Sequence, residues 1–217
     1  MHNTEALSWF SLICFNLVSS PDKIMYIPRH FEVTDDDQIF AFIEANGFGQ
    51  LISSVQGKLF SSHIPFLLSS DRLKLVGHLA KQNPQHTDID NQEVLVSLQG
   101  PHSYISPSWY SSPGVPTWNY QAVHIYGLCQ VFDDHEKIKI LVDSLTRKYE
   151  SSFQIPWQPD YKASMLGAII GIEVTIGEIQ GKFKLSQNRP AEDKEQVIEE
   201  LTNTGSISLA RAMRRNG

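Results

Sequence analysis

Runs of alternating apolar and polar residues, separated by turn residues, fill most of this 217-residue chain and leave few folds open to it. A period of two places every second side chain on one face and is typical of half-buried strands. Gln56 and Gly57 separate two such runs and predict a hairpin. The predicted strands lie near residues 49–55, 58–68, 73–80, 93–100, 117–132 and 165–185.

Helical segments accompany these strands. Thr34 is a candidate N-cap for the first helix, since three aspartates follow it and suit the positive end of a helix. Asp133 or Asp134 caps the second helix, and Thr204 with Gly205 divides the tail into two further helices. The predicted helices cover about residues 34–46, 134–149, 190–203 and 206–215.

The antiparallel character of the strands and the small number of long helices predict a mainly β protein, built as a small closed or split barrel. Glycines inside the strands, such as Gly127 and Gly177, are expected at bends or close backbone approaches. The length allows one sizeable core. We predict an N-terminal extension (residues 1–24), a barrel domain (25–189) and a C-terminal helical tail (190–217).

Composition excludes several classes of protein. The net charge of -6 argues against a broad basic face that holds nucleic acid. The two cysteines, Cys14 and Cys129, lie far apart and predict free thiols in a reducing compartment. Metal-ligand spacings and the GxSxG motif do not occur in the sequence. Glu173 and Glu178 would point to opposite faces of a regular strand, so any chemistry would come from a cofactor.

The first 24 residues differ from the rest of the chain. The apolar run from Trp9 to Val18 is too short to span a bilayer, and no basic region precedes it. Met25 begins a stretch that reads as an ordinary start. We therefore predict that residues 1–24 are a dispensable extension from an upstream start codon, with a signal peptide as the alternative.

The segment from Gly100 to Tyr120 is unusually rich in prolines and large aromatic rings. Prolines lower the entropy lost on folding, and buried rings need a partner surface. The segment is thus expected to form a stiff aromatic wall that suits a flat, polar, conjugated ligand. The alternative is a tightly packed structural loop. Polar groups along this wall are Ser106, Ser108, Thr117 and Asn119.

Two further segments carry candidate binding residues. The sequence GHLAKQNP places His78, Lys81 and Asn83 just past a strand, where cations and free N–H groups can hold a phosphate. The sequence GKFKLSQNR concentrates positive charge near the end of the last strand. The alternatives are a solvated polar loop for the first and a lysine-protected strand edge for the second. His63, in SSHIPF, is either a cofactor contact or a surface histidine at a strand end.

Taken in order, the segments MYIPRHF, SSHIPFLL, GHLAKQNP, GPHSYISPSWY, VPTWNY and GKFKLSQNR resemble the PaiB-type family of FMN-binding negative transcriptional regulators. The resemblance extends from about Met25 to about Leu209. It implies a six-stranded antiparallel split β-barrel, similar to pyridoxine-phosphate oxidases. It also implies a cytoplasmic homodimer with FMN at the subunit interface and a role in repression of sporulation and protease genes.

The resemblance also assigns roles to individual residues. Lys81, with His78, would meet the FMN phosphate, and Lys182 and Gln187 would reach in from the partner subunit. The remaining contacts expected around the cofactor are Ser61, Ser62, His63, Asn83, Trp118 and Asn119.

Other functions stay open at this point. A flavin-dependent oxidoreductase that uses NAD(P)H or a small substrate is one, and a haem-binding split-barrel protein is another. No helix-turn-helix signature occurs, and only Arg211, Arg214 and Arg215 form a basic end on the tail, so direct binding to DNA is weakly supported. No membrane association is expected.

Overall fold

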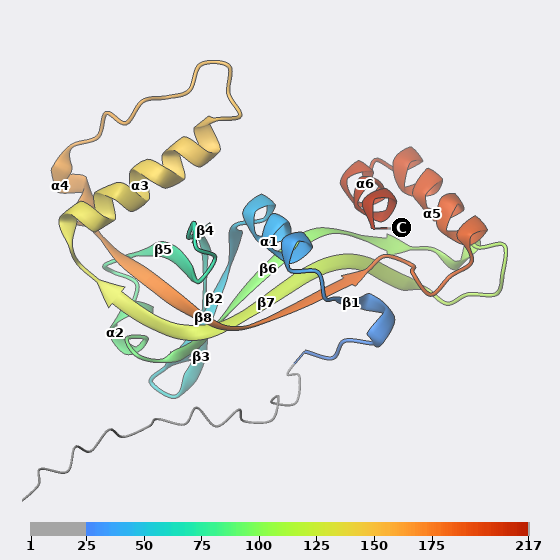
Figure 1. Cartoon of the computed structure of the whole chain (residues 1–217), viewed down its shortest axis with the longest axis horizontal. Coiled ribbons are helices and arrows are strands. Elements are labelled where there is room, and N and C mark those ends of the chain that lie inside the picture. Colours follow the sequence, from blue (N-terminus) through green and yellow to red (C-terminus); the bar gives the residue numbers. More distant parts are fainter. Residues whose placement is uncertain (1–24, 217) are drawn as a thin grey trace, which may run out of the picture.

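The computed structural model describes residues 25–216, so the prediction for residues 1–24 lies outside the described part of the chain. Its centre is an antiparallel sheet in the order β3-β2-β6-β7-β8-β5-β4, with β1 added beside β8 (Figure 1). The strands are β1 (Glu32–Val33), β2 (Phe48–Val55), β3 (Lys58–Pro65), β4 (Leu67–Leu68), β5 (Lys74–Ala80), β6 (Glu93–Ile105), β7 (Thr117–Phe132) and β8 (Ile169–Lys184).

The helices follow the predicted pattern closely. The sequence predicted either Asp133 or Asp134 as the cap of α3. In the structure Asp134 is the cap, and its carboxylate accepts a hydrogen bond from the N–H of Lys137 at 2.8 Å. Asp35, not Thr34, caps α1, because its carboxylate reaches the N–H groups of Asp37 and Gln38. The helices are η1 (Arg29–Phe31), α1 (Asp36–Ala45), α2 (Gln85–Asp88), η2 (Pro107–Trp109), α3 (His135–Glu150), α4 (Ala163–Leu166), α5 (Ala191–Asn203) and α6 (Ile207–Arg215).

Three strand boundaries differ from the prediction. The run 58–68 is broken at Phe66, whose N–H still bonds the carbonyl of Gly47 beside β2 at 2.7 Å, whereas Leu67 and Leu68 pair with β5. The last strand begins only at Ile169, because residues 163–166 form a helical turn. β6 continues past Gly100 to Ile105, with a bulge between Gln99 and His102 that accommodates Pro101.

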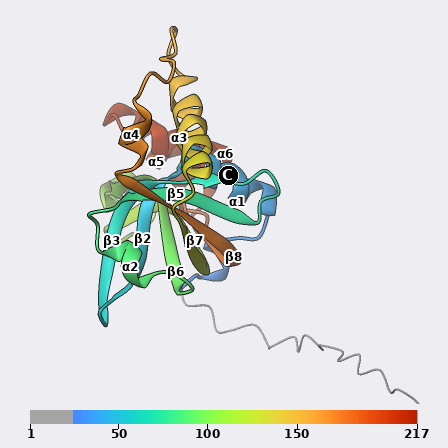
Figure 2. The ribbon, with the colours of Figure 1, turned by 90° about the vertical axis from the view of Figure 1, so that its left-hand side faces the viewer.

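The sheet curves into a split barrel (Figure 2). β3 and β5 approach at the open seam: a Cβ added to Gly77 would lie 3.1 Å from the carbonyl oxygen of Pro65. Asn83, just after β5, donates a hydrogen bond to the hydroxyl of Ser62 at 2.7 Å. The predicted split-barrel class is therefore confirmed, with the short strands β1 and β4 beyond the six that were predicted.

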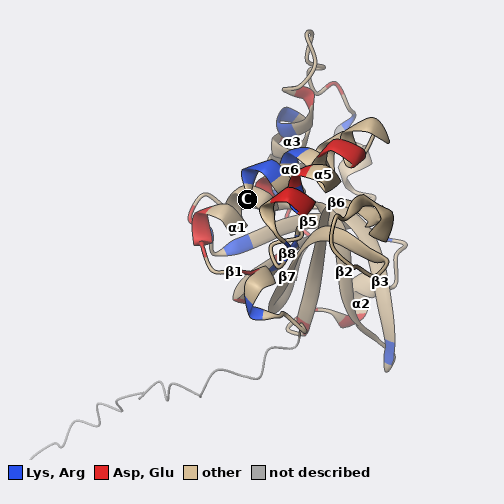
Figure 3. Ribbon diagram, turned by 90° about the vertical axis from the view of Figure 1, so that its right-hand side faces the viewer, with Lys and Arg blue, Asp and Glu red and all other residues tan. Residues whose placement is uncertain are grey.

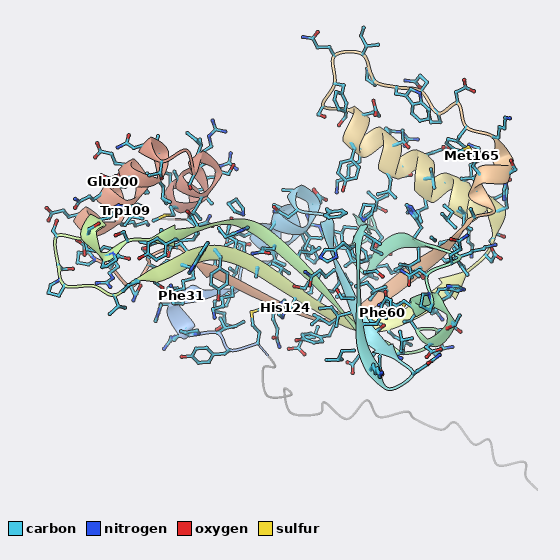
Figure 4. All side chains as sticks on the ribbon, turned by 180° about the vertical axis from the view of Figure 1, so that it is seen from behind. Phe31, Phe60, Trp109, His124, Met165 and Glu200 are labelled. Atoms are coloured by element: carbon cyan, nitrogen blue, oxygen red, sulfur yellow. The ribbon has the colours of Figure 1, made fainter. Side chains whose placement is uncertain are left out.

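One face of the long strands β6, β7 and β8 is covered by the chain's own helices. Apolar side chains of α1, α5 and α6, such as Phe42, Val197 and Met213, pack against buried sheet residues such as Val123 and Phe183. Figure 1 shows these three helices on the same side of the sheet. The opposite side of the same strands, which we call the outer face, carries no such layer (Figure 4).

A bulge at Gly177 changes which side chains share the outer face. Tyr126 pairs with Glu178, but Gly127 pairs with Ile176, so Gly177 is the extra residue. The prediction that Glu173 and Glu178 point to opposite faces is therefore wrong. They face the same side, opposite Gln130 and Tyr126, but lie too far apart along the strand to form a carboxylate pair.

Gly127 is required by a close approach of backbone. A Cβ at this position would lie 2.2 Å from the carbonyl oxygen of Thr175, which is fixed in β8. Gly177, on the neighbouring strand, would meet only Tyr126 O at 3.6 Å. We expect G127A to lower the free energy of unfolding by about 1 to 3 kcal/mol, the usual cost of overpacking. G177A is the matched control and should change it much less in urea titrations; equal losses would contradict this explanation.

Candidate functional site

A row of polar side chains crosses five strands on the outer face. The register pairs each member with the next, so their side chains lie on one side of the sheet. In a sheet whose other face is packed with apolar groups, such a row is free to meet a ligand or a partner. We call this set the polar row: His63, Gln50, Ser97, His124 and Gln180.

The two ends of the polar row have partners and its middle does not. Gln50 Nε2 lies 3.1 Å from His63 Nε2, and Gln180 Oε1 accepts the N–H of Met25 at 2.8 Å. His124 Nδ1 is buried and has no hydrogen-bond partner among residues 25–216. Burial also lowers the pKa of His124, which favours the neutral ring. An unpaired buried nitrogen of this kind is costly unless a bound group satisfies it.

A second row, one step along the strands, is less polar. It combines a hydroxyl, two aliphatic side chains, a phenol and a carboxylate, and it continues the outer face toward the β2–β3 hairpin. Apolar groups in this row offer contact area beside the hydrogen bonds of the polar row. Its members, paired in register, are Ser61, Ile52, Leu95, Tyr126 and Glu178.

The predicted aromatic wall is built from the ends of β6 and β7. Trp118 is 54% exposed, and its ring meets the edge of Tyr104 at a centroid distance of 6.2 Å. His102 lies on the other side of Trp118 at 6.4 Å. These rings continue the outer face at the end opposite the barrel seam. The wall is thus a pair of strand ends joined by a loop, and the rings are held by sheet geometry.

At the barrel seam, part of the predicted phosphate site comes together. Ser62 and Asn83 are joined by the hydrogen bond described above, while Ser61 faces outward on the same strand. Lys81 Nζ lies 2.8 Å from the Asp133 carboxylate at the surface, so its charge has a partner in the free chain. His78 Nδ1 is buried without a partner in the described residues, and burial lowers the pKa of its ring.

The other predicted residues lie at the far end of the long strands. Lys182 Nζ donates to Tyr26 O at 2.7 Å and lies over the rings of Tyr26 and Tyr120. The Asn119 amide is 1% exposed and donates to Ser186 at 2.9 Å, which assigns it a structural role. The Gln187 side chain accepts a hydrogen bond from the N–H of Leu185 and donates one to the carbonyl of Phe183, which stabilises the turn that contains it.

One chain therefore does not bring the predicted set together. Ser62 and Asn83 meet at the seam, with Ser61 and Lys81 close to them in the sequence, whereas Trp118 and Lys182 lie toward the other end of the long strands. The polar row lies between these two groups. Sequence reasoning included His63 but missed the row's other members. The available signal was the polar residue at every second position of strands that are otherwise apolar.

Two other features lie beyond the polar row. A hollow of about 700 Å³ between α3 and the strands β4, β5 and β7 is lined by none of the predicted residues. Burial raises the pKa of Cys129 to about 12, so this thiol is not a nucleophile near neutral pH. Within residues 25–216, no group of three metal-ligating side chains could hold a metal ion, and no helix has the length and hydrophobicity to cross a membrane.

The antiparallel split barrel, with an open polar and aromatic sheet face, defines a class of protein that includes flavin-binding domains. Residues 25–178 match the family model described as "Putative FMN-binding domain", and the chain belongs to this FMN-binding family. The protease synthase and sporulation protein PAI 2 of Bacillus subtilis is 42% identical over 187 residues, which cover 82% of this chain and 90% of that protein. An uncharacterised protein of Emericella nidulans is 31% identical, with 81% and 90% covered.

Two solved structures share the fold at low sequence identity. A flavocytochrome from Azotobacter vinelandii superposes with a TM-score of 0.58 at 15% identity, covering 80% of each chain. An FAD- and haem-binding protein from Mycobacterium smegmatis gives a TM-score of 0.59 at 16% identity, covering 76% of this chain and 78% of that one. At such identities the likeness establishes the fold alone. The resemblance seen in the sequence motifs is confirmed by the family match and by the Bacillus relative.

The two buried histidines predict a pH dependence of stability. Their pKa values are lowered from 6.5 by burial, so below that pH the unfolded chain binds more protons than the folded one. Their contribution is complete above pH 6.5 and is lost as the pH falls below it. Urea unfolding of a His78→Gln, His124→Gln double variant should therefore show a smaller loss between about pH 7.5 and pH 5.5 than the original chain.

The pH range in which the two histidines change stability differs from the pH range in which the hydrogen-bonded carboxylates do so. The pKa values of Asp71 and Asp143 are lowered from 3.8, mainly by hydrogen bonds from Ser69 and Lys139, respectively, and therefore act at lower pH. An Asp71→Asn variant is the control and should leave the loss between about pH 7.5 and pH 5.5 unchanged. An unaltered pH dependence in the double variant would show that neither buried ring carries the effect.

Proposed function

We propose that this chain is an FMN-binding regulatory protein of the PaiB type, which holds FMN against the outer face where two copies meet. The observation that carries the proposal is the polar row, with the buried and unpaired Nδ1 of His124 at its middle. A flavin ring is flat, and its edge presents both donors and acceptors, which is what such a row can bind. FMN supplies reversible hydride and electron transfer when it is bound.

The described residues fit the cofactor at both ends. Ser61 presents a hydroxyl on the outer face, and Lys81 supplies a cation two residues before Asn83, which bonds the neighbouring Ser62. Charge-assisted hydrogen bonds from such groups are the strong ones for a phosphate. The bond between Ser62 and Asn83 fixes the spacing of β3 and the turn after β5. In this proposal Lys81 exchanges its surface carboxylate partner for the phosphate.

A second copy would complete the site. The outer face exposes Leu59, Leu128 and Trp118, and exposed apolar groups on one sheet face are typical of a surface that is covered in the assembly. Two copies packed through this face would bring the Trp118 and Lys182 end of one chain to the seam of the other. We propose this homodimer because the two groups of predicted residues lie at opposite ends of one chain.

The biological role is inferred from the relatives. The Bacillus relative bears the name of a protease synthase and sporulation protein, and the sequence motifs imply repression of such genes. We propose the same regulatory role in the cytoplasm, with residues 25–189 as the FMN-binding domain and 190–217 as a tail docked on it. Arg214 of α6 lies beside Glu195 and Glu199 of α5, so we propose that regulation does not require a broad DNA-binding face on the tail.

Removing the seam cation tests the phosphate end. We expect K81A to weaken FMN binding tenfold or more, or about 1.4 kcal/mol, as measured by quenching of flavin fluorescence. K139A is the matched control, because Lys139 is also a surface lysine in an ion pair, with Asp143 at 2.6 Å. D133N frees Lys81 and should leave FMN binding unchanged or tighter. Equal affinity of K81A and the original chain would remove Lys81 from the site.

Charging the outer face tests the assembly. Leu128 is 46% exposed on this face, while Ile155 is 90% exposed in the loop between α3 and α4. L128D should convert the dimer to a monomer in sedimentation experiments and lower FMN affinity about tenfold or more, because a carboxylate would be buried unpaired. I155D should do neither. A chain that remains dimeric with L128D would show that another surface joins the copies.

A further inference from the structure

We propose that a second ligand site, for a small organic carboxylate with an apolar body, lies between α1 and α6. The site is a groove of about 440 Å³, which we call the tail groove. It lies on the helix-covered side of the sheet and is therefore distinct from the outer face proposed for FMN. The residues that carry the argument are Phe42, Gln121, Phe183, Arg211 and Arg215.

The positive charge of the groove comes from one side of α6. Arg211 and Arg215 are one helical turn apart, line the groove and are exposed. Neither guanidinium has an ion-pair or hydrogen-bond partner in the described part of the chain. Figure 3 shows the basic residues of α6 beside α1. Two adjacent unpaired guanidiniums favour an anion, which arginine can hold in a bidentate manner.

No neighbouring acid neutralises this charge. Among the described residues that line the groove, none is acidic. Two of the aspartates at the start of α1 have other partners: Asp35 caps the helix, and Asp37 pairs with Arg72 at 2.7 Å. Gln38, which follows them, donates a hydrogen bond to Asn216 and closes one end of the groove. The groove therefore keeps a net positive lining.

An independent sign of a ligand lies at the floor. Gln121 is only 6% exposed and lines the groove, yet its side-chain amide has no hydrogen-bond partner among residues 25–216. Among the described residues, the fully buried side-chain atoms without a partner belong to His78, Gln85 and His124, so the Gln121 amide opens into the groove, where a bound group can pair with it. A ligand carbonyl or carboxylate oxygen in the groove would accept from this amide. The observation does not depend on the arginines, because Gln121 comes from β7.

The floor around Gln121 is apolar and specifies the body of the ligand. The rings of Phe42 and Phe183 lie 5.1 Å apart between centroids, beside Pro101 and Ala212. A phosphate site usually adds backbone N–H groups, but those at the start of α1 are already capped by Asp35. The combination of two guanidiniums, one amide and two rings therefore points to a carboxylate attached to an apolar or aromatic group.

Such a ligand would join the tail to the barrel domain. α1 belongs to the barrel and α6 to the tail, and the ligand would contact both. Because it binds only when α6 is docked, mass action makes it stabilise docking. Binding of the ligand in the tail groove is therefore expected to slow hydrogen exchange in α6. This measurement does not depend on FMN.

The test uses the full chain with phenylacetate as the carboxylate probe, phenylacetamide as its neutral isostere and inorganic phosphate as the second anion. We expect saturable binding of phenylacetate in NMR titrations, with slower hydrogen exchange in α6. Phenylacetamide and inorganic phosphate should bind at least about tenfold more weakly than phenylacetate.

An R211A, R215A double variant should lose phenylacetate binding by a similar factor. R214A is the matched control, since Arg214 lies on the same helix but lines a different hollow, beside Glu195 and Glu199.

Gln121 provides a second and independent measurement. Q121L should weaken phenylacetate binding, because it removes the amide that would donate to the carboxylate. An unchanged affinity of Q121L would remove this amide from the site. Binding that is absent, equal for the amide probe, or equally reduced by R214A would overturn the site. Phosphate binding tighter than phenylacetate would overturn the assignment of a carboxylate.

Discussion

The antiparallel ladder of β6, β7 and β8 is the interaction on which the rest of the structure depends. β7 pairs with β8 from Tyr120 to Phe132 and with β6 over most of its length. Alternation along such long strands makes two faces: α1, α5 and α6 pack on one, whereas on the other α3 reaches only the end that carries Gln130 and Glu173. The apolar side chains of α1, α5 and α6 fill the inner face, whereas the outer face keeps its polar row and exposed rings.

This division explains where binding sites can form. On the outer face, the sheet fixes the positions of His63, His124 and Gln180 without any helix to occupy them. On the inner face, the helices bury nearly everything, and the tail groove is the place where α1 and α6 leave Gln121 without a partner. On the outer face the buried, unpaired nitrogen of His124 marks the position, and on the inner face an unpaired amide that opens into the groove marks it.

Local rules predicted much of the fold. The hairpin at Gln56 and Gly57, the cap at Asp134 and the division of the tail at Gly205 depend on a few neighbouring residues, and all three are present. The predictions of a strand boundary and of a side-chain face were wrong where pairing with a distant segment determines them. The predicted run 58–68 divides because Leu67 and Leu68 pair with β5 and not with β2, and Gly177 inverts the face of Glu173 through a register shift against β7. Neither effect follows from residues within a few positions.

The candidate site shows the same limit. The motifs indicated Ser61, Lys81, Trp118 and Lys182, but they could not show that these residues occupy opposite ends of one sheet face. The sequence by itself determined the strands, the helices, the split-barrel class and the FMN-binding family, because these follow from alternation, caps and motifs. Only the tertiary structure decided the polar row, since its five members meet through register between strands that are far apart in the chain.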